Sequence, residues 1–197
     1  MFDEQELLAA LRRHDSDAFT ILFETYSDKI YRLAVGLLEN ELEAEGIVQE
    51  TFLRFFERID QFEGRSKVST WLYRVAYNAS MDYLRRDKPH LSIELADEDD
   101  ALPMPAIFSD WSQWPEGLLS DAEVTAELDK AIAALPEKYR AIFLLREIEG
   151  LSTRETAHVT EISISAVKVR LHRARLILRE RLAESFSARI GDYAGHG

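Results

Sequence analysis

The residues whose types and spacing best suit a chemical task lie in the segment GLSTRETAHVTEISISAVKVRLHRAR, at positions 150–175. Ser152 and Glu155 have the spacing of a capping box at a helix start, and Ser163 can cap a second helix after a short turn. That second helix has an apolar side and an opposite side rich in cations. The apolar side comprises Val167, Leu171, Ala174 and Leu178, and the opposite side carries Ser165, Lys168, Val169, His172 and Arg173. Such a helix, entered through a tight turn, suits insertion into the major groove of DNA.

The alternative for this helix is an ordinary core helix with a solvated basic side. Two features favour the DNA-binding interpretation. The first is the capped partner helix with its short turn. The second is local charge, since residues 165–181 carry six basic side chains and only one acidic residue, Glu180.

A second segment with potential chemistry is FEGRSKVSTWLYRVAYNASMDYLRR, at residues 62–86. Aromatic rings alternate with cations along a predicted helix, a combination that suits single-stranded nucleic acid because unpaired bases stack on rings. Asn78 could hydrogen-bond to a base edge. The alternative is that Trp71 and Tyr73 are core residues, and it stays open from these residues alone.

The net charge of −12 over 197 residues contrasts with this nucleic-acid interpretation. The contrast is explained by position, because the stretch from Pro89 to Asp129 holds eleven acidic residues and no Lys or Arg. The rest of the chain carries 25 acidic and 24 basic residues and is close to neutral. The local field matters more than the total charge for binding a polyanion.

Composition also excludes several classes of function. The chain has no cysteine, so we expect neither a disulfide framework nor a thiolate metal site. The five histidines form no metal-ligand spacing, and no nucleophile–base motif or glycine-rich phosphate loop is present, so we expect no metal, no cofactor and no enzymatic activity. The sequence predicts a cytoplasmic protein without membrane insertion, because no apolar run is long enough and the first residues do not resemble a signal peptide.

The predicted fold class is all-α, with two small helical domains joined by an acidic linker. We expect helices at 3–14, 15–40 (one long or two broken), 41–60 and 69–86 in the first domain, and at 121–134, 136–149 and the two of the helix–turn–helix in the second. Pro136 is expected at the first position of its helix. The predicted boundaries are 1–89 for the first domain, 90–120 for the linker, 121–186 for the second domain and 187–197 for a flexible tail. Tryptophans in the linker predict that it anchors on the domains or on a partner.

Four motifs in this order resemble the extracytoplasmic-function class of bacterial RNA polymerase sigma factors. They are the stretch from Ala18 to Tyr26, the stretch from Ala44 to Arg54, the stretch from Ser69 to Asn78, and a final group made of Leu135 to Arg140, Gly150 to Ser152 and Val167 to Arg175. The match covers about two-thirds of the chain. The resemblance implies a non-enzymatic subunit that binds core RNA polymerase, through its clamp helices and flap, and directs it to promoter DNA.

The resemblance also implies a role for each matching position. The residues facing polymerase would be Glu45, Gln49, Glu50, Leu53 and Arg54. Those reading and melting the minus-10 element would be Arg65, Ser66, Lys67, Trp71, Arg74, Tyr77 and Asn78. Those at the minus-35 element would be Arg154, Ser165, Lys168, Val169, His172, Arg173 and Arg175. An anti-sigma factor is an expected partner by the same resemblance.

Five positions depart from the family pattern. Gly46 replaces a usually acidic residue in a helix interior, where glycine costs about 1 kcal/mol. Glu161 stands in the turn where the family often has glycine, next to Thr160 at a usually apolar position, and a positive φ there would strain it. Ala166 and Val169 replace commonly polar residues on the reading helix, which indicates altered minus-35 specificity.

Two other functions are compatible with parts of this pattern. One is a sigma-mimicking protein that sequesters an anti-sigma factor without binding DNA, and the retained cations of the last helix argue against it. The other is a helix–turn–helix repressor with a ligand-binding first domain, and the polymerase-facing helix at 41–60 argues against that.

Overall fold

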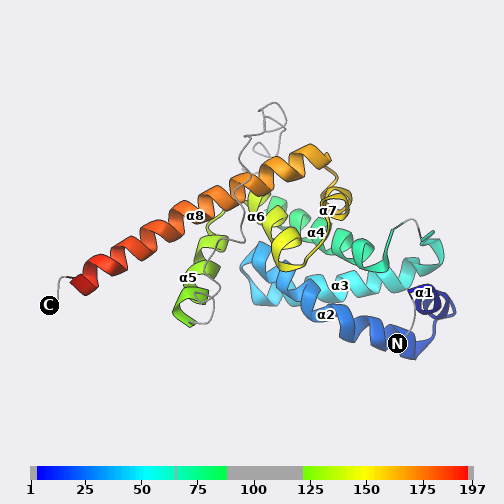
Figure 1. The fold of residues 1–197 in the computed structure, drawn as a ribbon. Helices are drawn as coiled ribbons and strands as arrows, with labels where there is room; N and C mark the ends of the chain where they lie inside the picture. The colour runs from blue at the N-terminus through cyan, green and yellow to red at the C-terminus, as the bar shows by residue number, and fades with distance from the viewer. Residues whose placement is uncertain (1–3, 65, 88–121, 195–197) are drawn as a thin grey trace.

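The computed structural model describes residues 4–64, 66–87 and 122–194, and every regular element among them is a helix (Figure 1). The predicted all-α fold class is therefore confirmed. The whole of the predicted linker, with its acidic residues and two tryptophans, lies outside the described residues. Within the described part of the chain, no helix is long and apolar enough to cross a bilayer.

The described residues of the first domain form four α-helices and one short 3-10 helix. They are α1 (Glu4–Arg12), α2 (Ser16–Leu38), α3 (Glu41–Arg58), η1 (Ile59–Gln61) and α4 (Val68–Asp87). Side-chain caps set the starts of the two long helices: Asp15 accepts hydrogen bonds from the first turn of α2, and Asn40 does so for α3. The segment 16–38 is one unbroken helix.

The apolar faces of these helices meet in a core around Leu22, Leu33, Phe55 and Leu72, each 1% exposed or less. Two large rings of this domain, Phe23 and Phe56, remain about half exposed. Their rings lie at the edge of the α2–α3 contact, where Phe23 packs against Phe52, and Phe56 packs against Phe19 and His14.

In the second domain, the part of the chain that the structure describes forms four α-helices and one π-helical turn. They are α5 (Ala122–Ala133), α6 (Glu137–Phe143), η6 (Leu144–Ile148), α7 (Thr153–Thr160) and α8 (Ile164–Ala194). Pro136 has ψ 139° and precedes α6, so its predicted place inside the helix was off by one residue. The predicted helix 136–149 changes to π geometry at its end, where the Glu149 N–H donates to the Leu144 carbonyl. α8 continues over 187–194, which lies within the segment predicted to be a flexible tail.

The two domains pack against each other and share one continuous cluster of buried residues. α2 contacts α5, α6 and η6, while α4 contacts α7. Gly36 permits close approach of α2 to η6, since a Cβ at this position would lie 2.9 Å from Leu144 Cδ1. Buried Arg140 crosses the same boundary, donating to Glu39 at the end of α2 and to the Ala133 carbonyl.

Candidate nucleic-acid interface

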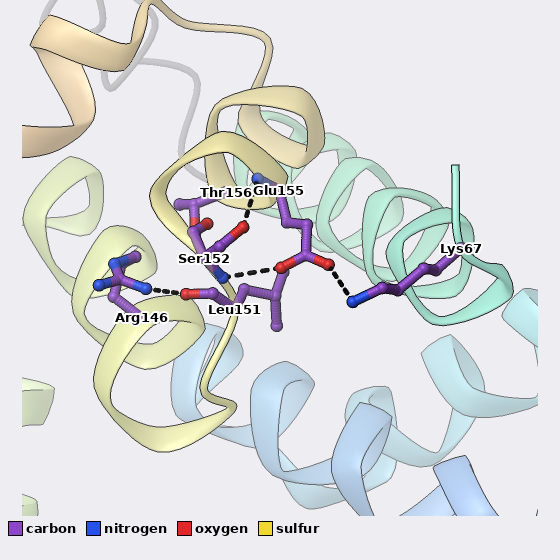
Figure 2. Close-up of polar contacts among 6 residues, drawn as sticks. All are labelled: Lys67, Arg146, Leu151, Ser152, Glu155 and Thr156. Carbon is purple, nitrogen blue, oxygen red and sulfur yellow. Dashed lines mark hydrogen bonds and ion pairs between the residues drawn. The ribbon is translucent and has the colours of Figure 1, made fainter. Parts of the chain in front are cut away.

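The helix–turn–helix begins with the predicted capping box at α7. The Ser152 N–H donates to Glu155 Oε2 over 2.8 Å, and the Glu155 N–H donates to Ser152 Oγ over 3.2 Å (Figure 2). Arg146 also donates to the Leu151 carbonyl just before the helix, so the entry into α7 is held from both sides. The capping prediction is confirmed.

The turn between α7 and α8 contains the strained residue that the sequence pointed to. Glu161 lies in the left-handed region, with φ 57° and ψ 33°, directly after Thr160. Ser163 then accepts a hydrogen bond from the Ala166 N–H over 3.0 Å and caps α8 as predicted.

The predicted minus-35 residues differ in how α7 and α8 present them. Arg154, Ser165 and Lys168 are exposed, while His172, Arg173 and Arg175 are partly buried. Arg175 is paired with Glu147 over 2.8 Å. Val169, expected on the outer face, is only 9% exposed, because it lies one position past the exposed Lys168 and turns toward the protein interior. In this conformation Val169 is therefore not on the accessible reading surface.

The predicted minus-10 residues lie at the start and along one side of α4, except Arg65, which is outside the described residues. Trp71 packs edge-on against Phe55, with ring centroids 5.1 Å apart, so the core interpretation is partly right for this residue. Tyr77 is partly buried, and this burial raises the pKa of its hydroxyl. Asn78 is also partly buried and lines a depression shared with Glu161 of the second domain.

Two cations of this set are paired with carboxylates of the helix–turn–helix. Lys67 Nζ lies 2.9 Å from Glu155 Oε1 (Figure 2), and Arg74 donates to Glu161. The Ser152 side chain and backbone, followed by Lys67, lower the pKa of Glu155 to about 2. The helix–turn–helix thus meets α4 through charge pairs as well as through apolar contact.

Glu149 makes a further contact between the domains that sequence analysis did not predict. Glu149, with 1% of its side chain exposed, accepts from Tyr73 Oη over 2.7 Å and from Arg32 Nε over 3.3 Å. Burial, followed by the hydrogen bond to Glu149, raises the pKa of Tyr73. One signal was available: a glutamate directly before Gly150 lies at a helix end where the dipole disfavours negative charge, which indicates that it needs a partner.

The predicted polymerase-facing side of α3 is open to solvent. Glu45, Gln49 and Leu53 are exposed, and Glu50 pairs with Arg54 one turn later. Leu53 is 58% exposed and adds an apolar contact surface among these polar side chains.

Comparison with known proteins identifies the family. Residues 22–89 match the model for Sigma-70 region 2, and residues 125–178 match the model for Sigma-70, region 4. The chain is 37% identical over 176 residues to the ECF RNA polymerase sigma factor SigW of Bacillus subtilis (strain 168), covering 88% of this chain and 94% of that protein. The chain belongs to the extracytoplasmic-function sigma factors. The resemblance predicted from the four motifs is confirmed.

Two solved structures share the fold of this sigma factor. One is CnrH in complex with the cytosolic domain of CnrY, with a TM-score of 0.65 and 22% identity, covering 92% of this chain and 99% of that chain. The other is the sigma factor RpoE in complex with the anti-sigma factor NepR from Bartonella quintana, with a TM-score of 0.62 and 22% identity, covering 84% and 96% respectively. At these identities the likeness concerns the fold. Over the described residues, the sigma factor contains no cluster of three metal-ligating side chains.

Proposed function

We propose that this sigma factor binds core RNA polymerase and directs promoter-specific transcription initiation as a non-catalytic subunit in the cytoplasm. The observation that supports it most is the presence in one chain of two distinct surfaces suited to nucleic acid. One is the capped helix–turn–helix with a cationic second helix, and the other is the aromatic and cationic α4.

Each surface has a proposed role. Lys168 and Ser165 of α8 enter the minus-35 major groove, with Arg154 of α7 near the phosphates. Ser66, Lys67 and Arg74 meet the displaced strand of the minus-10 element, together with Tyr77 and Asn78. The exposed side of α3 around Leu53 docks on the polymerase clamp, and the second domain docks on the flap.

An anti-sigma factor is part of the proposal. The support is the fold shared with RpoE, whose structure was solved with the anti-sigma factor NepR. We propose that a protein of that class binds this sigma factor and competes with polymerase.

The first test is co-elution of the purified chain with core RNA polymerase at moderate salt, comparing Leu53→Asp with Ile21→Asp. Both are exposed aliphatic side chains of the first domain, at 58% and 37%, but Ile21 lies on α2, outside the proposed polymerase surface. We expect wild type and Ile21→Asp to form a one-to-one complex and Leu53→Asp to lose it. A folded wild-type chain that forms no complex would refute the proposal and favour the sigma mimic.

A further inference from the structure

Three carboxylates of the second domain face the first domain, and we call them the acidic face: Glu149, Glu155 and Glu161. They lie at the end of η6, in the first turn of α7 and at the end of α7. Each binds donors of the first domain. Glu149 holds Arg32 and Tyr73, Glu155 holds Lys67, and Glu161 holds Arg74.

Two of these donors have another role in the proposed function. Lys67 and Arg74 are the cations assigned to the minus-10 strand. A guanidinium or ammonium group binds carboxylate and phosphate oxygens through the same charge-assisted hydrogen bonds. A cation already paired with Glu155 or Glu161 is therefore less available to a DNA phosphate.

The distance between the two promoter elements is too large for the packed conformation to bind both of them. Elements centred about 25 base pairs apart are separated by roughly 85 Å at 3.4 Å per base pair. In this structure α4 and α7 are in direct contact, with Lys67 and Glu155 only 2.9 Å apart. The packed conformation cannot read both elements at once, so the domains must separate before the promoter is bound.

We propose that the acidic face is a built-in competitor of DNA that keeps the free sigma factor closed. This inference rests on the proposed function. Glu155 and Glu161 occupy the minus-10 cations in place of phosphates, and Glu149 adds a buried hydrogen-bonded contact beside them. Opening by polymerase would release the cations and the reading helix together.

The decisive variant is the double substitution Glu155→Gln with Glu161→Gln. Glutamine at position 155 preserves the capping box, so α7 stays intact while both charges are lost. The matched control is Glu57→Gln with Glu180→Gln, which removes the same charge from exposed positions outside the acidic face. Circular dichroism checks that all three proteins are folded.

The first readout is fluorescence anisotropy of a labelled single-stranded DNA of mixed sequence, added to the free protein at fixed salt. We expect the acidic-face variant to bind at least fivefold more tightly than wild type, and the control less than twofold. An equal gain in DNA affinity in both variants would mean that the net charge alone causes it. That result would overturn the proposal.

The second readout is the distance between the domains. The chain has no native cysteine, so spin labels can be placed through Thr20→Cys and Ala183→Cys, both exposed and in different domains. We expect one narrow distance distribution for wild type and an added population at longer distance for the acidic-face variant, whose apolar contacts and Glu149 contacts still hold the remaining molecules closed. An unchanged distribution would overturn the proposal.

The polymerase experiment separates this inference from the proposed function. If wild type fails to bind core polymerase, the proposed function fails whatever the two readouts give. If wild type binds polymerase but the acidic-face variant matches the control in either readout, the competitor role alone fails.

Discussion

Glu161 has a strained backbone conformation and also forms an ion pair with Arg74. Its φ of 57° costs a residue with a Cβ about 1 kcal/mol or more, and its carboxylate holds Arg74. Glu161→Gln and Glu161→Asn both remove the charge, but asparagine tolerates the left-handed region better.

We expect Glu161→Asn to exceed Glu161→Gln in free energy of unfolding by about 0.5–1 kcal/mol, because only the strain differs between the two variants. Urea denaturation of the two proteins measures this difference. Equal stabilities would mean that the turn relaxes to a negative φ in the variants.

Glu155 makes stability depend on pH in the acid range. A carboxyl whose folded pKa, here about 2, lies below the ordinary value of 4.5 stabilises the folded state above pH 4.5, and this stabilisation is lost as the pH falls toward 2. We expect wild type to exceed Glu155→Gln by at most about 1 kcal/mol above pH 5, since water screens a partly exposed pair. Unfolding followed from pH 6 to pH 2.5 should show that difference shrinking; a constant difference would contradict the role of the charge.

Sequence reasoning at the residue scale worked where the partners are close in the chain. The capping box of Ser152 and Glu155 and the strained turn at Glu161 depend on neighbours within four positions. The partners of Glu149 are 76 and 117 residues away, and no local pattern indicates which donors would meet it.

At the scale of elements, α3 carries a glycine that its structure does not require. Gly46 lies in the helix interior, and a Cβ at this position would meet nothing within 4 Å. We expect Gly46→Ala to raise the free energy of unfolding by about 1 kcal/mol through helix propensity alone. Thermal unfolding measures the change, and a loss of stability would indicate a contact that the present structure lacks.

The helices were largely predictable because apolar spacing and caps are local signals. The π-helical turn η6 was not, because LLREI has an ordinary helical composition. Its geometry coincides with the packing of Leu144 against Gly36, a contact with another domain. Likewise Val169 is buried although its sequence neighbours predicted an outer position.

At the scale of the whole molecule, Gly36 sets how closely the domains approach. Gly36→Ala adds one methyl group near the flexible end of Leu144, which can rotate away, so we expect the free energy of unfolding to change by less than about 1 kcal/mol. Gly36→Leu cannot be accommodated in this way and should cost about 1–3 kcal/mol, or open the interface.

Urea denaturation and the label pair described above distinguish these two results for Gly36→Leu. Wild-type stability together with an unchanged distance would show that the interface is looser than the structure indicates. The packing of the domains was beyond sequence analysis, because it depends on contacts between residues roughly a hundred positions apart, such as Arg140 with Glu39.

The two carboxylate oxygens of Glu155 bind different partners, and this affects how fast the domains can separate. Oε2 accepts from the Ser152 N–H within its own domain, and only Oε1 reaches across to Lys67. When the domains part, α7 keeps its cap and has no structure to rebuild. Separation is then a rigid-body movement, which proteins complete in microseconds to milliseconds, so refolding would not delay the arrival of α8 at its target.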